Sequence, residues 1–280
     1  MTVGHATQPK LRVNGATKVY NTRSGHLLAI DGCSLDITDG EIVSIVGPSG
    51  CGKTTLLWSM SGLHGLTAGE VLLDGIPVKG PNPQIGMVFQ EANLLPWRNL
   101  DANINFPFEI KGTRPDRAWI NELLERVGLE GFGGRFPREL SGGMQQRAAL
   151  VRALSYRPSV LLMDEPFGAL DAFTREEMNH LVEEIWLDTR TTIVLITHSI
   201  DEAIFLSDRV VVMSPRPGRV ANIHEVPFPR PRSLEIMSTK EVFDLTNAIK
   251  LEIVGTQQSR FPQGGTASSR PIAADVAGTA

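Results

Sequence analysis

The chain has 280 residues, of which 41% are hydrophobic and 21% charged, a composition typical of a globular protein with one large domain or a domain that carries an inserted subdomain. Its formal net charge of −4 gives it no basic character, so we expect no nucleic acid among its main partners. Its longest apolar runs have the length of strands, far below the roughly 18 residues of a membrane-spanning helix, so any membrane role is expected to be peripheral.

The N-terminal part of the chain is predicted to be mainly β-structure. Residues 1–10 are expected to be a flexible leader, and they contain no apolar stretch of the signal-peptide type. Short apolar and β-branched segments predict strands between residues 11 and 37. Two more strands, at 69–73 and 76–78, flank an Asp-Gly hairpin signal. We expect these strands to form an antiparallel sheet.

A glycine-rich loop with the pattern G-x-x-x-x-G-K-[ST] lies at residues 47–54, between an apolar run at 41–46 that predicts a buried strand and a stretch that predicts a helix. Strand, glycine loop and helix are the setting of a triphosphate-binding loop. The glycines leave backbone N–H groups uncovered, and the helix N-terminus adds further donors. The residues predicted to bind the nucleotide here are Gly47, Pro48, Ser49, Gly50, Cys51, Gly52, Lys53, Thr54 and Thr55.

Two side chains of this loop have predicted roles of their own. Lys53 is expected to reach the outer phosphates as a point charge, and the Thr54 hydroxyl is expected to bind Mg²⁺. Cys51 and Cys33 are the only cysteines of the chain and have no metal-ligand spacing, which suits a reducing cytosol. We expect both cysteines to be buried or half-buried filling residues, and we expect alkylation of Cys51 to block nucleotide binding.

The middle of the chain changes character after a predicted buried strand at 85–89, which ends at Gln90. The apolar spacing of residues 116–127, followed by a glycine, predicts a helix, and the chain is again mostly helical beyond residue 140. We interpret residues of about 91–158 as a helical subdomain that is inserted between two strands of the nucleotide-binding core.

The C-terminal half alternates apolar strand-length runs with helical stretches, which predicts an α/β fold with a parallel sheet. The predicted strands are 160–163, 193–196 and 210–213, and the predicted helices are about 172–188 and 200–206. Beyond them we expect a loop or edge strand in 214–232 and a helix in 239–254. Residues 255–280, rich in Gly, Ser, Ala, Pro and Gln, are predicted to be disordered.

Two adjacent carboxylates, Asp164 and Glu165, follow the predicted strand at 160–163. The carboxyl ends of parallel strands face the ligand crevice of an open α/β sheet. Asp164 is suited to hold Mg²⁺, and Glu165 is suited to orient or deprotonate an attacking water. Alone, the pair would be consistent with a simple acidic turn, but after a phosphate-binding loop it indicates nucleotide hydrolysis.

Residues 140–145 read L-S-G-G-M-Q, and this run resembles the signature of the ATP-binding subunits of ABC transporters. The resemblance covers roughly residues 11–213 and includes the nucleotide motifs of that family in order. It implies a P-loop NTPase core of ABC type, with an antiparallel β subdomain and the inserted helical subdomain, in a domain of residues 11–254. It also implies a homodimer that sandwiches ATP, in which Ser141, Gly142 and Gly143 meet the γ-phosphate of ATP bound to the other copy.

The same resemblance assigns roles to four residues that carry little signal alone. Gln90 matches the loop glutamine that contacts Mg²⁺ or water, and His198 matches the switch histidine that touches the γ-phosphate. Asp171 matches the acidic residue that passes information across the dimer, although Gly168 stands where the family often has serine. Tyr20 matches the aromatic residue that stacks on adenine, with packing in the core as its alternative.

Three segments, 89–97, 164–175 and 215–219, resemble the nitrate, sulfonate and taurine importer group within that family. This implies an ATPase at the cytoplasmic face of the inner membrane that powers transmembrane permease subunits. A solute-binding protein, as an indirect partner, would deliver the solute to the permease. Residues 94–97 are expected to form part of the groove for the permease, with internal packing as the alternative. The solute stays open among nitrate, sulfonates, taurine and pyrimidine precursors.

Three other classes of protein are disfavoured. ABC ATPases that act on ribosomes or DNA usually carry two cassettes or a long coiled-coil insertion, whereas this chain has one cassette and a short helical insertion. A binding module that does not hydrolyse its nucleotide would not need both Glu165 and His198. A GTPase would be expected to carry an N-K-x-D guanine motif, which does not occur in the sequence.

Overall fold

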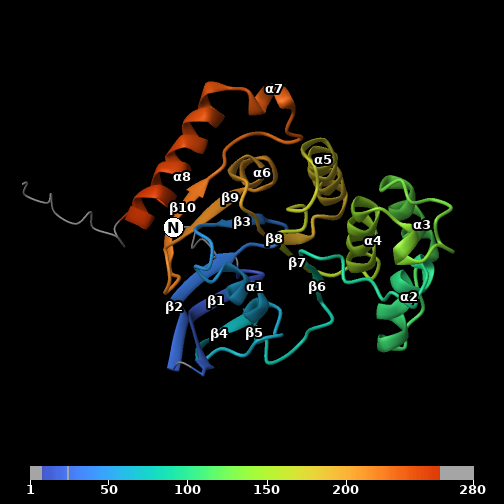
Figure 1. The fold of residues 1–280 in the computed structure, drawn as a ribbon, viewed down its shortest axis with the longest axis horizontal. Helices are drawn as coiled ribbons and strands as arrows, with labels where there is room; N and C mark the ends of the chain where they lie inside the picture. The colour runs from blue at the N-terminus through green and yellow to red at the C-terminus, as the bar shows by residue number, and fades with distance from the viewer. Residues whose placement is uncertain (1–7, 24, 259–280) are drawn as a thin grey trace, which may run out of the picture.

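The computed structural model describes residues 8–23 and 25–258 (Figure 1). Most of the predicted leader and most of the predicted tail lie outside these residues. The last helix, however, ends only at Gln258, so residues 255–258 are helical and the prediction that the tail begins at residue 255 is wrong at its start.

One layer of the fold is a four-stranded antiparallel sheet of order β2-β1-β4-β5. Its strands are β1 (Leu11–Thr22), β2 (Gly25–Ile37), β4 (Ala68–Leu73) and β5 (Ile76–Pro77). The Asp-Gly hairpin signal is confirmed, since Asp74 and Gly75 both have positive φ, 49° and 77°. Between residues 11 and 37 the structure has one long hairpin, β1 with β2, in place of several short strands.

The second layer is a six-stranded sheet of order β10-β9-β3-β8-β7-β6. Its strands are β3 (Ile42–Val46), β6 (Ile85–Val88), β7 (Val160–Asp164), β8 (Thr192–Ile196), β9 (Arg209–Met213) and β10 (Val220–Glu225). Neighbouring strands pair in parallel, except that β10 pairs antiparallel with β9. β10 is an edge strand within residues 214–232, where a loop or an edge strand was predicted. Every residue of β3, β7 and β8 is buried, as expected for parallel strands covered on both faces.

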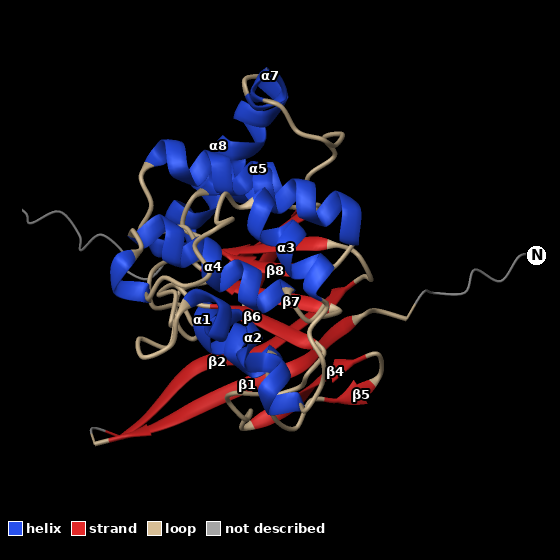
Figure 2. Cartoon of the chain, turned by 90° about the vertical axis from the view of Figure 1, so that its right-hand side faces the viewer, coloured by secondary structure: helices blue, strands red, loops and turns tan. Residues whose placement is uncertain are grey.

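Helices fill the space between the two sheets and cover the outer face of the parallel sheet (Figures 1 and 2). Helix α1 (Lys53–Met60) contacts strands of both sheets. On the opposite face lie α5 (Ala172–Thr189) and α6 (Ile200–Leu206), and α8 (Lys240–Gln258) packs on α6 after the short α7 (Leu234–Met237). Among the described residues, no helix is long and apolar enough to cross a membrane.

The helical insertion lies between β6 and β7 and forms the lobe at the right of Figure 1. It consists of α2 (Leu100–Lys111), α3 (Arg117–Arg126), a 3₁₀ turn (Pro137–Glu139) and α4 (Gly142–Leu154). Each α-helix begins at a side-chain cap, respectively Asn99, Asp116 and Ser141. The prediction of an α/β core with an antiparallel sheet and an inserted helical part is therefore confirmed.

Candidate nucleotide-binding site

The phosphate-loop pattern lies between the end of β3 and the start of α1. Gly52, the residue before the helix, has φ of 108°, and a Cβ there would stand 2.6 Å from Cγ2 of Ile30 and 2.9 Å from the carbonyl oxygen of Ala29. Only glycine satisfies both constraints. No side chain caps α1, so the N–H groups of its first turn are directed at the loop interior, where an anion is stabilised.

Lys53 is buried inside this loop, with 5% of its surface exposed. Its Nζ donates hydrogen bonds to the carbonyl oxygens of Gly47, at 2.9 Å, and Pro48, at 3.1 Å. The phosphate loop therefore curves around the ammonium group. This places a fixed positive charge beside the uncovered N–H groups of the helix N-terminus.

Asp164 lies at the end of β7, opposite the first turn of α1. Its two carboxylate oxygens accept hydrogen bonds from Thr54 Oγ1, at 3.1 Å, and from Trp58 Nε1, at 3.2 Å. Burial and the neighbouring charge of Glu165 raise the pKa of Asp164, although the two hydrogen bonds oppose that shift. A hydroxyl and a carboxylate in this arrangement are hard oxygen donors, which fit Mg²⁺.

Glu165 and His198 face each other across the ends of β7 and β8. His198 Nε2 lies 2.6 Å from Glu165 Oε1. The backbone N–H of Glu165 donates to the carbonyl oxygen of Ile196, at 2.9 Å, and Glu165 has φ of 47°, in the left-handed region that non-glycine residues seldom adopt. Such backbone conformations cluster at functional sites.

Lys53, Thr54, Glu165 and His198 border one cavity of about 270 Å³. Its lining includes nine of the predicted nucleotide-binding and catalytic residues: Tyr20, Ser49, Gly50, Gly52, Lys53, Thr54, Thr55, Glu165 and His198. Cys51 is instead buried, with 1% exposed, and burial raises its thiol pKa. Tyr20 presents a polar end here, since its hydroxyl lies 3.0 Å from His64 Nδ1 and 3.4 Å from Thr55 Oγ1.

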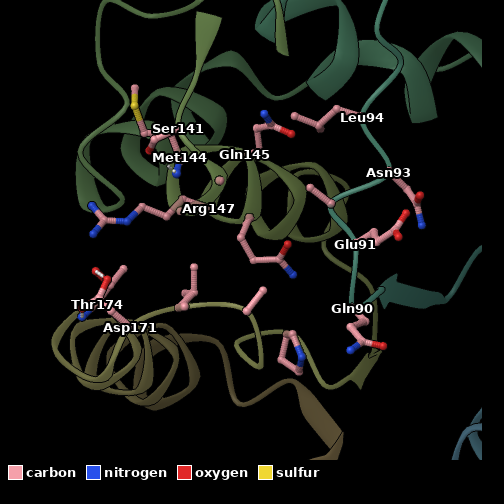
Figure 3. Close-up of a pocket in the computed structure, with 17 residues that line it drawn as sticks. Gln90, Glu91, Asn93, Leu94, Ser141, Met144, Gln145, Arg147, Asp171 and Thr174 are labelled. Carbon is pink, nitrogen blue, oxygen red and sulfur yellow. Dashed lines mark hydrogen bonds between the residues drawn. The ribbon is translucent and has the colours of Figure 1, made fainter. Parts of the chain in front are cut away.

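Five other predicted residues line a second cavity, of about 880 Å³ (Figure 3). In it, Ser141 caps α4 by accepting from the Met144 N–H at 3.2 Å, and Asp171 caps α5 by accepting from the Thr174 N–H at 3.1 Å. The hydrogen bonds from Thr174 lower the Asp171 pKa. The lining also holds Gln90, Gly142 and Gly143.

One chain thus does not bring all of the predicted site together. Thr54 and Asp164 meet, but the third predicted Mg²⁺ ligand, Gln90, is exposed and lines the second cavity. Ser141, Gly142, Gly143 and Asp171 likewise do not border the phosphate-loop cavity.

Sequence reasoning missed several residues that hold these loops. Trp58 lies in the stretch that was predicted only to form a helix, but its Nε1 donates to Asp164. Gln146, buried in α4, donates from Nε2 to the carbonyl oxygen of Phe89 at 3.0 Å, which ties the helix to the segment before Gln90. A buried glutamine on an otherwise apolar helix face was the signal that could have revealed this contact.

Glu202, in the first turn of α6, is a third missed residue. It is 5% exposed, and its Oε1 has no hydrogen-bond partner among the described residues. Burial raises its pKa, while a hydrogen bond with Thr197 and the charge of Arg175 lower it. Arg175 in turn donates to the carbonyl oxygen of Leu170 at 2.7 Å, so the loop before Asp171 and the loop before His198 share one polar cluster.

Comparisons with known proteins identify the family. Residues 30–168 match the ABC transporter family. An uncharacterized ABC transporter ATP-binding protein of Methanocaldococcus jannaschii is 43% identical over 250 residues, which cover 88% of this chain and 93% of that protein. The taurine import ATP-binding protein TauB of Jannaschia sp. is 50% identical, over 73% of this chain and 77% of that protein. The aliphatic sulfonates import ATP-binding protein SsuB of Bacillus cereus is 40% identical, over 82% and 91%.

Solved structures agree with these relatives. A dimeric ATP-binding cassette in a post-hydrolysis state, bound to ADP and Pi, superposes with a TM-score of 0.70 at 32% identity and covers 78% of this chain and 100% of that one. The cbiO1 protein of Clostridium perfringens, part of the ABC transporter complex cbiONQ, gives a TM-score of 0.69 at 27% identity, over 90% and 99%. The chain therefore belongs to the ABC transporter family, as an ATP-binding subunit with ATPase activity.

Proposed function

We propose that the chain hydrolyses ATP to power the import of a small solute such as nitrate, an aliphatic sulfonate or taurine. The observation that carries the ATPase part is the meeting of Lys53, Glu165 and His198 around one cavity beside an uncapped helix N-terminus. Asp164 is joined to this cavity by the hydrogen bond from Thr54, which lines it. The names of the relatives TauB and SsuB support the solute class. Taurine and alkanesulfonates share the sulfonate group, so one importer type would handle both.

In this proposal, catalysis rests on positioning and on charge stabilisation. Lys53 and the loop N–H groups neutralise the phosphates, Tyr20 stacks on the adenine, and Glu165 orients the attacking water or accepts its proton. His198 holds the Glu165 carboxylate and contacts the γ-phosphate. Mg²⁺, held by Thr54 and Asp164 and supplemented by Gln90, would neutralise charge on the phosphate oxygens when it is bound.

We also propose that two copies sandwich two ATP molecules. Ser141, Gly142, Gly143 and Asp171 lie in a cavity separate from the phosphate loop of their own chain, so a second copy would have to present them to the nucleotide. Ser141 is the N-cap residue of α4. At this helix start, its hydroxyl and the helix N–H groups can meet a γ-phosphate. The dimeric cassette among the similar structures supports this arrangement.

The membrane partners proposed are transmembrane permease subunits at the cytoplasmic face of the inner membrane, with a solute-binding protein as an indirect partner. Trp97, with 71% of its surface exposed, is the strongest support for a docking surface on the helical insertion. Aromatic residues are enriched in the cores of protein interfaces, and an isolated subunit gains nothing from leaving a tryptophan in water.

Size-exclusion light scattering of Glu165→Gln, with and without Mg-ATP, tests the ATP sandwich. The expected result is a monomer that becomes a dimer only with Mg-ATP, while Lys53→Ala, which should not bind ATP productively, stays monomeric. A Glu165→Gln protein that stays monomeric while the wild type hydrolyses ATP briskly would mean that each site works alone. That outcome would overturn the sandwich and weaken the transporter proposal with it.

A further inference from the structure

The loop between β9 and β10 packs directly on the phosphate loop. Its residue Gly218 donates its N–H to the carbonyl oxygen of Ala29 and accepts from the N–H of Asp31, both at 2.9 Å, so it is bound to β2. A Cβ on Gly218 would stand 2.0 Å from the carbonyl oxygen of Cys51, inside the phosphate loop. Only glycine allows this approach, so the loop at 214–219 is packed closely against the phosphate loop.

The same loop is closed by its own hydrogen bonds. The Ser214 N–H donates to the carbonyl oxygen of Arg219 at 2.9 Å, and the Arg219 N–H donates to Ser214 Oγ at 3.1 Å. The Arg219 guanidinium is held outside the cavity by an ion pair with Asp31. The backbone on both sides of Arg216 is thus tied down, which limits where its side chain can reach.

Arg216 is the residue of this loop that borders the nucleotide cavity. It lines the cavity together with Ser49, Lys53 and His198, and its Nη2 lies 4.0 Å from the place where a Cβ on Gly50 would stand. Its side chain makes no hydrogen bond or ion pair with any residue that the structure describes. A cation without a protein partner therefore faces a loop built to hold an anion.

We propose that Arg216 is a further nucleotide-binding residue, whose guanidinium contacts the polyphosphate of bound ATP beside the Gly50 end of the phosphate loop. A guanidinium presents a planar fork of donors that matches phosphate oxygens, which an ammonium cannot do. Lys53 would then act as a point charge from within the loop and Arg216 as an oriented clamp from outside it. This inference rests on the proposed nucleotide site.

The test measures the Kd of the full-length protein for a fluorescent ATP analogue, mant-ATP, in the wild type, Arg216→Gln, Arg216→Lys and the matched control Arg219→Gln. Arg219→Gln removes the same charge three residues away in the same loop. We expect Arg216→Gln to raise the Kd about tenfold, as for the loss of one charge-assisted hydrogen bond, and Arg216→Lys to raise it less. Arg219→Gln should stay within about twofold, since exposed ion pairs contribute little.

Three results separate this inference from its alternatives. If the wild type shows no saturable binding, the proposed nucleotide site itself fails. If the wild type binds but Arg216→Gln binds equally well, or if Arg219→Gln is weakened as much, the assignment of Arg216 is overturned. If Arg216→Gln binds normally while Glu165→Gln combined with Arg216→Gln no longer dimerises with ATP, Arg216 contacts the second copy and not the nucleotide.

Discussion

His198 Nε2 lies 2.6 Å from Glu165 Oε1, and the register of two parallel strands sets this distance. Asp164, the last residue of β7, pairs with Ile196, the last residue of β8. Glu165 and His198 therefore leave the sheet at the same edge, one and two residues further on. The contact joins a carboxylate and an imidazole in the lining of the phosphate-loop cavity, and it connects the loop after β7 to the loop after β8.

The first prediction concerns this pair. His198→Ala should lower kcat about 100-fold, a usual effect for a group that assists proton transfer, while the Kd for ATP changes only a few-fold, because the base and the loop contacts persist. Phosphate release and mant-ATP binding measure the two quantities. His26→Ala is the control, since His26 is bonded to Asn21 near the tip of the β1–β2 hairpin. Unchanged turnover in His198→Ala would contradict the role of the pair.

The parts of the fold that were predictable are those that local chemistry determines. The buried strands predicted at 41–46, 160–163 and 193–196 are rich in apolar residues, and a parallel sheet covered on both faces requires such strands. The Asp-Gly turn follows from the backbone freedom of its two residues. The end of α8 was misplaced because Gly255 was taken as the helix stop, whereas the helix continues through this glycine and the polar residues after it to Gln258.

The candidate site was predictable in its residue types but not in its geometry. Glu165 and His198 are 33 residues apart, and only the strand register brings them together. Trp58 and Gln146 look like ordinary helix residues in the sequence, and their hydrogen bonds to distant loops depend on how α1 and α4 pack. The separation of Ser141 from the phosphate loop of its own chain was implied by family resemblance and by nothing in the local pattern.

Trp58→Phe isolates the hydrogen bond that Trp58 Nε1 donates to Asp164 Oδ2 at 3.2 Å. Phenylalanine keeps most of the apolar bulk but leaves that carboxylate oxygen without its partner, so the carboxylate is less well oriented. We expect the ATPase to need several-fold more Mg²⁺ for half-maximal activity, with a smaller change in kcat at saturating Mg²⁺. Trp119→Phe, which removes a similar hydrogen bond to Leu154 in the helical insertion, should leave the Mg²⁺ dependence unchanged. An equal Mg²⁺ dependence in both variants would contradict the prediction.

Thiol labelling tests the burial of the two cysteines. Burial raises the pKa of Cys33 to about 11 and also raises that of Cys51, and both side chains are nearly inaccessible. A thiol is protonated below its pKa, so at pH 8 the reactive thiolate is scarce, and its fraction grows only as the pH rises toward the raised value. We expect negligible labelling of the folded protein at pH 8 and labelling of both thiols in denaturant. Rapid labelling of the folded protein would contradict this expectation. The predicted block of ATP binding by alkylation of Cys51 can therefore be tested only on protein that was alkylated under conditions that expose this thiol.

Arg232 is a candidate for the largest stability effect outside the nucleotide cavity. It is 2% exposed, and its Nη1 donates to three carbonyl oxygens at the end of α6, those of Ile204, Phe205 and Ser207, at 2.6, 2.8 and 2.7 Å. Burial lowers its pKa to about 10, so it remains charged at neutral pH. Arg232→Met should lower the free energy of unfolding by about 3 kcal/mol, because buried carbonyl groups lose their donors. Urea denaturation measures the free energy of unfolding of this variant and of the control Arg114→Met, which replaces an exposed arginine. Equal free energies of unfolding for the two variants would refute the prediction.

The last prediction concerns docking to the membrane subunits. Asn103, fully buried in α2, accepts from the Leu95 N–H at 2.7 Å and donates to the Arg98 carbonyl oxygen at 2.9 Å, so the loop that carries Trp97 is held rigidly from below. Leu94 packs on the core of the insertion, whereas Trp97 stays 71% exposed, so internal packing accounts for the first residue but not for the second. A rigid loop that presents an aromatic side chain binds with a low entropic cost.

Trp97→Ala should therefore leave the fold and the basal ATPase of the isolated subunit intact but weaken assembly with the permease by about 2 kcal/mol or more, the effect of removing an interface hot spot. Co-purification with the permease and solute uptake measure assembly and transport. The control is Phe243→Ala, which removes an exposed phenylalanine from α8, a helix at the left of Figure 1, whereas the helical insertion is at the right. Wild-type assembly and uptake in Trp97→Ala would refute the docking surface, because a tryptophan this exposed has no other packing role to lose.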